Sequence, residues 1–475
     1  MDLQTIKKTL IDISLLFLLT LLLGLSKPRL SGVSDYYSQA LGLQLLVLII
    51  AFFGLVLSPS RASRMLIIIS TTLVLLGVFQ QAVVAADAPV LTRTEAGVRV
   101  YSVNYKSAMF AIVIASFVIT LYAIARSRAK FYNERVDCIR RWVSNILSTP
   151  LTAIMCCAVT IIIPLAIGAG GSHFAFGGIQ LAELCKLSYI LAASIILNAN
   201  YNRHNSTTIN LVVQRRSWLN SFWWLWVFTA VCVGAFLVQD ELGTALVIVI
   251  TAITISVIFT ADRAEFYKSA SILILLVAVV IGIMLCLAYL IGVDRISNIF
   301  GKISYRFSPM FDFMDNVSML HKNGNGASDQ QYQGLMAISS GGLWGWFTEY
   351  YIPVINSHND MAFSLTVQLF GLAGGIAVIL GYSVISLIGN YITNRISNYQ
   401  FKAIALGAST MLLSQSFLQI AGNISAFPLI GNNLPFLSEG GSSLLVSMIL
   451  IGILIVENTR TEEEQSEKGK TWLDT

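Results

Sequence analysis

Charged residues are scarce in this chain. Asp, Glu, Lys and Arg make up only 12% of its 475 residues, about half the share found in an average soluble domain. Hydrophobic residues make up 56%, and the mean hydropathy is +0.73. The apolar runs are long and lack the strict alternation of a β-barrel. These features exclude an ordinary soluble enzyme and predict an all-α polytopic membrane protein.

Several other signals are also missing. The six Cys residues contain no CxxC pair, so we expect neither a disulfide nor a structural metal. No basic stripe interleaved with aromatic residues is present, which argues against a nucleic-acid partner. The first apolar run is not followed by a small-residue cleavage site, so we expect it to be retained as a membrane span.

About twelve apolar runs are long enough to cross a bilayer, which takes about 20 residues per helix. We predict spans at about residues 10–26, 41–58, 65–86, 107–125, 148–168, 182–199, 219–237, 242–261, 270–292, 361–389, 403–425 and 441–457. Lys and Arg are densest at residues 126–141, which predicts a cytoplasmic location for that segment. Both chain ends, including the acidic tail 458–475, are then cytoplasmic.

One long segment interrupts the spans. Residues 293–360 lie between predicted spans nine and ten and form a large loop on the outer, extracytoplasmic side. Its centre, "KNGNGASDQQ" at residues 322–331, is typical of a mobile polar tract. Its aromatic-rich flanks are expected to be ordered, because loops of this length are usually functional or disordered.

Four polar clusters lie at the outer ends of predicted spans, where polar groups are costly unless they have a role. They are Glu183 with Lys186, Asp240 with Glu241, the run His358–Asn359–Asp360, and "SEGGSS" at 438–443. Each has a purely structural alternative: a local ion pair, an acidic helix start, a helix N-cap and close helix packing through small residues, respectively. All four clusters lie on the same, outer side of the predicted topology, which favours one external site over four unrelated structural features.

Five motifs carry a family resemblance. They are "IQLAELCKL" (179–187), "QDELGTAL" (239–246), "YQGLMAISSGGLWGW" (332–346), "HNDMAFSLTVQLFGLAG" (358–374) and "AGNISAFPLIGNNLPFLSEGGSS" (421–443). In this order they resemble the SEDS proteins (shape, elongation, division and sporulation), also called the FtsW/RodA/SpoVE family. The resemblance covers about residues 165–455, and residues 1–145 match weakly.

The resemblance implies a ten-helix core preceded by two added helices. We therefore divide the chain into N-terminal transmembrane helices (1–145), a SEDS-like core (146–457) containing loop 293–360, and a cytoplasmic tail (458–475). It also implies an inverting glycosyltransferase that polymerises lipid II into peptidoglycan glycan strands, for cell shape or division. The reaction would occur at the outer face of the bacterial inner membrane and release undecaprenyl diphosphate. The implied partner is a class B penicillin-binding protein.

Roles for individual residues follow from the resemblance and from the chemistry. Asp360 aligns with the family's essential loop aspartate and is the expected general base. Lys186 aligns with a motif lysine and suits the diphosphate or the donor sugar, and Arg306 could add a bidentate phosphate contact. Further substrate-binding candidates are Glu183, Glu241, Gln333, His358, Ser438, Glu439, Ser442 and Ser443. Mg²⁺ or Mn²⁺ bridging a carboxylate and the diphosphate stays open, although no all-protein metal cage is evident.

The motifs also depart from the family pattern. The Tyr before Gly-Gly is Glu439 here, the Glu pair of the EELG motif becomes Gln368–Leu369, and QPD becomes Gln239–Asp240–Glu241. Two alternatives therefore remain beside the polymerase: a flippase for the lipid-linked precursor, and a catalytically impaired scaffold that recruits a penicillin-binding protein. Because Asp360 and Lys186 are both kept, an active enzyme is favoured.

Overall fold

The structure is a computed structural model. It describes residues 10–18, 34–57, 60–87, 90–94, 97–101, 155, 158–159, 161–162, 175–176, 179–205, 223–238, 241–259, 327–345, 352 and 354–471. Helices carry the architecture, as the hydropathy predicts. Beside a short helical segment at 10–18, they are α2 (Ser34–Leu57), α3 (Arg61–Asp87), α7 (Leu181–Asn205), α8 (Trp223–Val238), α9 (Leu242–Phe259), α12 (Ala327–Ser340), α13 (Ala362–Arg395), α14 (Tyr399–Asn423) and α15 (Gly441–Thr471).

Two short antiparallel hairpins accompany the helices. One joins β1 (Val90–Thr94) to β2 (Gly97–Tyr101), and the other joins β3 (Ala175–Phe176) to β4 (Ile179–Gln180). The hydropathy pattern gave no sign of them, because strands this short bury little surface. The second hairpin leads directly into α7, one of the helices that carries a predicted site residue.

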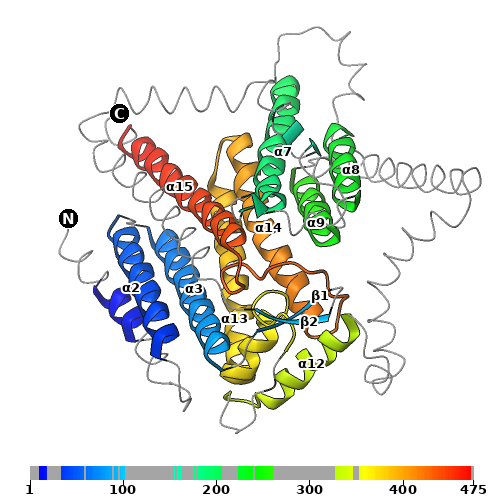
Figure 1. Ribbon diagram of the computed structural model, residues 1–475. Coiled ribbons are helices and arrows are strands. Elements are labelled where there is room, and N and C mark those ends of the chain that lie inside the picture. Colours follow the sequence, from blue (N-terminus) through cyan, green and yellow to red (C-terminus); the bar gives the residue numbers. More distant parts are fainter. Residues whose placement is uncertain are drawn as a thin grey trace, which may run out of the picture.

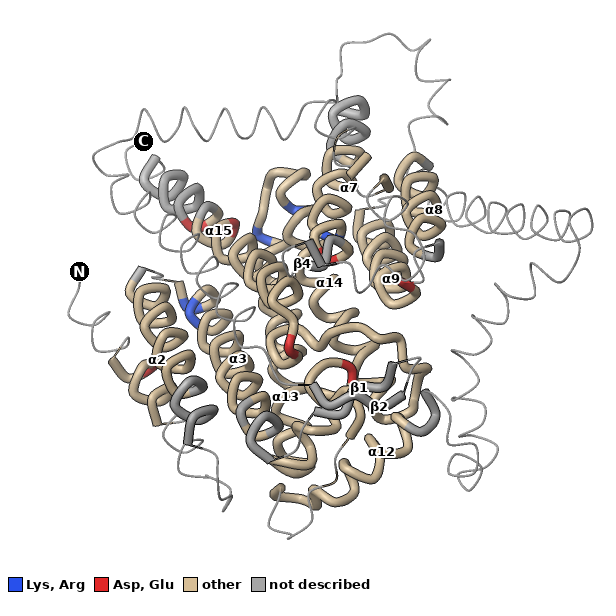
Figure 2. Tube along the Cα trace, in the orientation of Figure 1, with Lys and Arg blue, Asp and Glu red and all other residues tan. Residues whose placement is uncertain are grey.

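Five helices in the described part of the chain are long and apolar enough to cross a membrane. These spans are Arg61–Gln81, Leu242–Phe259, Ala362–Arg395, Tyr399–Asn423 and Gly441–Thr459, and Leu41–Val56 and Trp224–Phe236 are shorter apolar helices. Few charged residues interrupt them (Figure 2). The chain is thus a multi-pass membrane protein. Predicted spans such as 107–125 and 270–292 fall outside the described residues, so the count of twelve stays a prediction.

Helix α14 is the central helix of the bundle. It lies among α13, α9, α7 and α15 (Figure 1), and 89% of its most apolar window is buried. Its start is capped by Asn398, whose side-chain oxygen accepts hydrogen bonds from the backbone N–H groups of Gln400 and Phe401 at 3.0 and 3.3 Å. Its exposed side chains are apolar and include Leu413 and Phe417, whereas its polar side chains Gln415, Gln419 and Asn423 are buried against other parts of the protein.

Helix α13 is kinked at Gly371, which has φ of 69° and ψ of −177°. The kink is fixed from outside by the turn that follows α12. The N–H groups of Leu372 and Ala373 donate to the carbonyl oxygens of Gly342 and Leu343 at 2.9 and 3.1 Å. A Cβ at position 371 would lie 2.2 Å from the nitrogen of Gly345. Only glycine fits this backbone conformation and this close approach.

A polar cluster joins the start of α3 to α15. The side-chain amide of Asn458, on α15, donates to the hydroxyls of Ser60 and Ser63 at 2.7 and 3.0 Å. The Ser60 hydroxyl in turn donates to Glu462 at 2.7 Å. The predicted tail 458–475 therefore begins as a continuation of helix α15, which runs to Thr471, and it lies against the start of α3.

The predicted mobile tract at 322–331 is wrong in its second half. Residues 327–331 form the beginning of α12. The two Gln residues at positions 330 and 331 hold this turn in place: their side-chain amides donate to the carbonyl oxygens of Ile355 and Gly422 at 3.2 and 3.1 Å. Composition alone suggested mobility because these partners come from distant segments of the chain.

Candidate functional site

Two loops that are distant in sequence meet at one end of α14. They are the turn at 354–361, which leads into α13, and the segment 432–440, which leads into α15. The N–H of Glu439 donates to the carbonyl of His358 at 2.7 Å, and the hydroxyl of Ser438 donates to the carbonyl of Asn359 at 2.8 Å. Phe436 has a φ of 70°, which is unfavourable for a bulky residue, so tertiary contacts hold the segment 432–440.

The carbonyl of Asp360 is bound by a row of amides on α14. Gln415, Gln419 and Asn423 are four residues apart, so they lie on one face of the helix. The side-chain amides of Gln419 and Asn423 both donate to the Asp360 carbonyl, the latter at 2.7 Å. Asn423 also accepts from the N–H of Ser364 at 3.1 Å. The main chain at Asp360 is therefore fixed, while its side chain is partly exposed.

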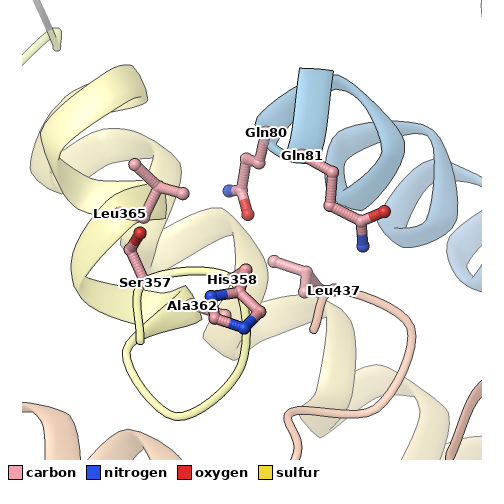
Figure 3. Close-up of a pocket in the computed structure, with 7 residues that line it drawn as sticks. All are labelled: Gln80, Gln81, Ser357, His358, Ala362, Leu365 and Leu437. Atoms are coloured by element: carbon pink, nitrogen blue, oxygen red, sulfur yellow. The ribbon is translucent and has the colours of Figure 1, made fainter. Parts of the chain in front are cut away.

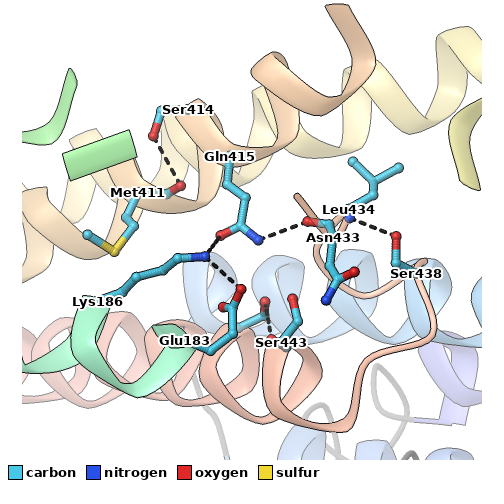
Figure 4. Close-up of polar contacts among 10 residues, drawn as sticks. Glu183, Lys186, Met411, Ser414, Gln415, Asn433, Leu434, Ser438 and Ser443 are labelled. Carbon is cyan, nitrogen blue, oxygen red and sulfur yellow. Dashed lines mark hydrogen bonds and ion pairs between the residues drawn. The ribbon is translucent and has the colours of Figure 1, made fainter. Parts of the chain in front are cut away.

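The third member of this row, Gln415, contacts the buried ammonium of Lys186 (Figure 4). Lys186 comes from α7 and is 0% exposed. Its Nζ donates to Glu183 at 2.8 Å and to the side-chain oxygen of Gln415 at 3.0 Å. The nitrogen of Gln415 donates to the carbonyl of Asn433 at 2.8 Å. Of the three ammonium hydrogens, these contacts use two, and Nζ has no further partner among the described residues.

Lys186 and Asp360 are thus connected through a single helix face. Gln415 and Gln419, which contact them, are one helical turn apart, a rise of about 5–6 Å. Helix α13 begins at Ala362, and its N-cap residue is Met361, which makes no side-chain capping bond. The alternative of Asn359 or Asp360 as N-cap is therefore wrong.

A small, tight pocket lies beside His358 (Figure 3). Its lining consists of Gln80, Gln81, Ser357, His358, Ala362, Leu365 and Leu437. Burial lowers the pKa of His358 from 6.5 to about 4, because the surroundings disfavour the charged imidazolium. His358 is therefore neutral at physiological pH and can act there as a hydrogen-bonding group, not as a cation.

The other predicted residues occupy varied positions. Gln333, on α12, accepts from the N–H of Ile355 at 3.2 Å and so holds the aspartate turn. Glu241 precedes α9 and is partly exposed, and its carbonyl begins that helix by accepting from the N–H of Ala245 at 3.2 Å.

Ser442 and Ser443 are buried in the first turn of α15. The hydroxyl of Ser443 has no hydrogen-bond partner among the described residues, and Arg306 lies outside them.

The described part of the site offers no protein cage for a metal ion. Within the described residues, no three His, Cys, Asp or Glu side chains are placed to hold a metal ion. The carboxylates that are present, such as Asp360 and Glu439, are on separate loops. A divalent cation at this site would need oxygen ligands from a substrate, as Mg²⁺ commonly takes from phosphates.

Several residues of the site were not predicted from the sequence. They are Gln80 and Gln81 on α3 and the row Gln415, Gln419 and Asn423 on α14. A signal for the row exists, because three amides spaced by four residues in an apolar span are costly in a membrane. The pair on α3 gives no comparable signal, because its position at a span end also suits a solvated residue.

Comparisons with known proteins support the motif resemblance. The model of the FtsW/RodA/SpoVE family, described as cell cycle proteins, matches residues 82–463. A Bacillus subtilis relative named "Probable peptidoglycan glycosyltransferase FtsW" is 29% identical over 322 residues, covering 64% of this chain and 72% of the relative. The peptidoglycan glycosyltransferase MrdB of Helicobacter pylori (strain ATCC 700392 / 26695) is 34% identical over 130 residues, covering 26% of this chain and only 33% of MrdB.

Similar solved structures include a peptidoglycan synthase complex that coordinates polymerization and crosslinking, with a TM-score of 0.45, 16% identity and coverage of 76% of this chain and 98% of that chain. The rod shape determining protein RodA of Thermus thermophilus matches with a TM-score of 0.39 and 16% identity. The match covers 75% of this chain and 97% of the RodA chain. The family model alone covers most of the sequence, including both site loops and α14. The chain therefore belongs to the FtsW/RodA/SpoVE family of cell cycle proteins.

Proposed function

We propose that this protein is a peptidoglycan glycosyltransferase that polymerises lipid II at the outer face of the bacterial inner membrane. The observation that carries the proposal is the connection of Asp360 and Lys186 through α14. One face of α14 contacts both the Lys186 ammonium and the main chain of Asp360, and a carboxylate base and a cation are the two groups that the transfer requires. Relatives named as peptidoglycan glycosyltransferases support the same reaction.

In the proposed reaction, the 4-hydroxyl of the acceptor sugar attacks the anomeric carbon of the donor. Asp360 takes the hydroxyl proton as the new glycosidic bond forms. The bond from the anomeric carbon to the diphosphate breaks, and undecaprenyl diphosphate leaves with the electron pair. The third hydrogen of the Lys186 ammonium offers a charge-assisted contact to a diphosphate oxygen, which requires the buried side chain to become accessible.

The arrangement of the two loops suits this chemistry. Because the backbone at Asp360 is held by Gln419 and Asn423, little reorganisation is needed to place the carboxylate, which favours catalysis. Glu439 and Ser438 lie on the facing loop and are proposed to contact the glycan. We further propose a class B penicillin-binding protein as the partner, and cytoplasmic chain ends.

The direct test is Asp360→Asn in the purified full-length protein supplied with lipid II and a candidate partner. Gln419 and Asn423 bind the main-chain carbonyl of Asp360. The substitution does not change this carbonyl, so the variant should keep its thermal stability. We expect glycan polymer, measured on gels, to fall at least a hundredfold, because an amide cannot take the proton.

The matched variant is Glu439→Gln, which changes a carboxylate to an amide on the facing loop. We expect it to weaken substrate binding but to leave turnover at saturating lipid II largely intact. Normal polymer formation by Asp360→Asn would refute Asp360 as the base. Complementation of a deletion strain by a polymer-deficient Asp360→Asn variant would favour the scaffold alternative.

A further inference from the structure

The pocket beside His358 contains two polar side chains for which the proposed reaction gives no role. Gln80 and Gln81 come from the C-terminal part of α3 and line the pocket together with His358 and Leu437 (Figure 3). Both amides are more than nine-tenths buried, with exposed fractions of 1% and 5%. The pocket adjoins the turn that carries Asp360, so a group bound there would lie next to the proposed reaction centre.

The orientation of the Gln80 amide is fixed by its neighbour. Its nitrogen donates to the hydroxyl oxygen of Thr366 at 2.6 Å. That hydroxyl donates its own hydrogen to the carbonyl of Ala362 at 2.8 Å, so Thr366 must accept from Gln80. The amide oxygen of Gln80 consequently points away from Thr366, and it has no hydrogen-bond partner among the described residues.

The amide oxygen of Gln81 has no partner within the described part of the chain either. Buried polar atoms are nearly always hydrogen-bonded, and exceptions need an explanation. Two adjacent buried acceptors at one small pocket indicate a ligand that brings hydrogen-bond donors. They also exclude an anion, because amide oxygens repel a phosphate or carboxylate that has no hydrogen to donate.

We infer that Gln80 and Gln81 form an acceptor subsite that binds hydroxyl or amide N–H groups of the lipid-linked sugar substrate beside Asp360. The inference rests on the proposed function, since it assigns a part of that substrate to this pocket. In this conformation the pocket leaves no room for a water molecule, so a single substituent, such as an acetamido or hydroxymethyl group, enters only when the lining side chains move apart. The donors come either from the sugar or from the first amide of the stem peptide.

The test measures the dissociation constant of fluorescent lipid II for the purified full-length protein in detergent. Gln80→Met and Gln81→Met remove the acceptors and keep the side-chain length. One neutral hydrogen bond corresponds to about a threefold to tenfold change in affinity, so each variant should bind that much more weakly. Thr366→Val is the matched control, because it breaks the same Gln80 contact from the other end and leaves the acceptor in the pocket.

The outcomes are separable. If Gln80→Met and Gln81→Met bind lipid II as tightly as the wild type, or if Thr366→Val weakens binding equally, the inference is wrong and the pocket takes no part in substrate binding. A lipid-linked disaccharide without the peptide then identifies the source of the donors: a deficit that persists assigns the sugar, and one that disappears assigns the peptide. Polymer formation by the wild type decides the proposed function independently of these binding constants.

Discussion

At the scale of the residue, variants of the buried ion pair between Lys186 and Glu183 can distinguish a role in stability from a role in catalysis. The side chains are 0% and 8% exposed, and removal of one partner leaves an uncompensated buried charge. Lys186→Met should therefore lower the free energy of unfolding by about 3–5 kcal/mol, seen as a lower thermal unfolding temperature in detergent. The double variant Glu183→Gln/Lys186→Met removes both charges and should recover most of that loss.

Polymer formation should be absent from both variants, because neither has the cation at the diphosphate. A double variant that is stable and also polymerises lipid II would show that the ammonium serves the fold alone. Lys186→Arg provides the complementary comparison, because it retains a charge but changes the geometry of the contact.

His358 makes stability depend on pH. Its pKa is lowered from 6.5 to about 4 in the folded protein, so the unfolded chain binds the proton first as the pH falls. Neutral His358 therefore contributes about 3 kcal/mol to the free energy of unfolding. This stabilisation is fully present above pH 6.5 and is lost as the pH falls toward 4. His358→Gln should flatten the fall in unfolding temperature between pH 6.5 and 4, and Ser357→Ala, which carries no titrating group, should not.

A site residue could be predicted from the sequence when the features that mark it lie close to it along the chain. Lys186, Asp360 and Ser438 stand in motifs whose residue types and spacing are visible along the chain. Gln415 and Gln80 gain their meaning only from the loop or pocket that they face, and those neighbours are more than ten residues away. Whether the predicted residues act as assigned is decided by the variants above.

At the scale of the element, the kink of α13 depends on main-chain contact. Gly371→Ala places a Cβ against the nitrogen of Gly345 at a positive φ, so the turn after α12 must separate from α13. We expect a loss of about 2–4 kcal/mol in unfolding free energy and reduced polymer formation, because the same helix begins directly after Asp360. Thermal unfolding and a polymerisation assay measure the two effects.

Gly452→Ala is the matched control for this prediction. Gly452 lies within α15, and a Cβ there meets nothing within 4 Å. The substitution should leave stability unchanged or raise it by up to about 1 kcal/mol, as expected for Ala in a helix. Equal destabilisation by both substitutions would contradict the account of the kink.

The helices themselves could be predicted because hydropathy is a property of each segment alone. The spans predicted at 242–261 and 403–425 agree with α9 and α14 within a few residues. The kink at Gly371 and the helix at 327–331 could not be predicted in this way. Both result from hydrogen bonds to segments that are distant in the sequence.

At the scale of the whole molecule, the bundle has two different polar ends. The site loops and α12 lie at one end, whereas the turn at 396–398 and the Ser60–Asn458 cluster lie at the other (Figure 1). If the site faces outward, a cysteine at Ser339 on α12 should react with a membrane-impermeant maleimide in intact cells. A cysteine at Ser397, also exposed, should react only after lysis.

The experiment uses a background without the native cysteines, and labelling of both positions after lysis confirms that each is reactive. Labelling of Ser397→Cys in intact cells, with Ser339→Cys protected, would reverse the orientation and place the proposed reaction on the wrong side of the membrane. The same data would test the cytoplasmic placement of the C-terminal part of α15.

The contact between the turn at 341–345 and α13 has a consequence for evolution. It consists of peptide groups, which every sequence possesses, together with glycines at the points of closest approach. Exposed side chains on α12, such as Met336, can therefore diverge between lineages while the attachment of this helix is inherited unchanged. The exterior can adapt to new neighbours without disturbing the chemistry beneath it.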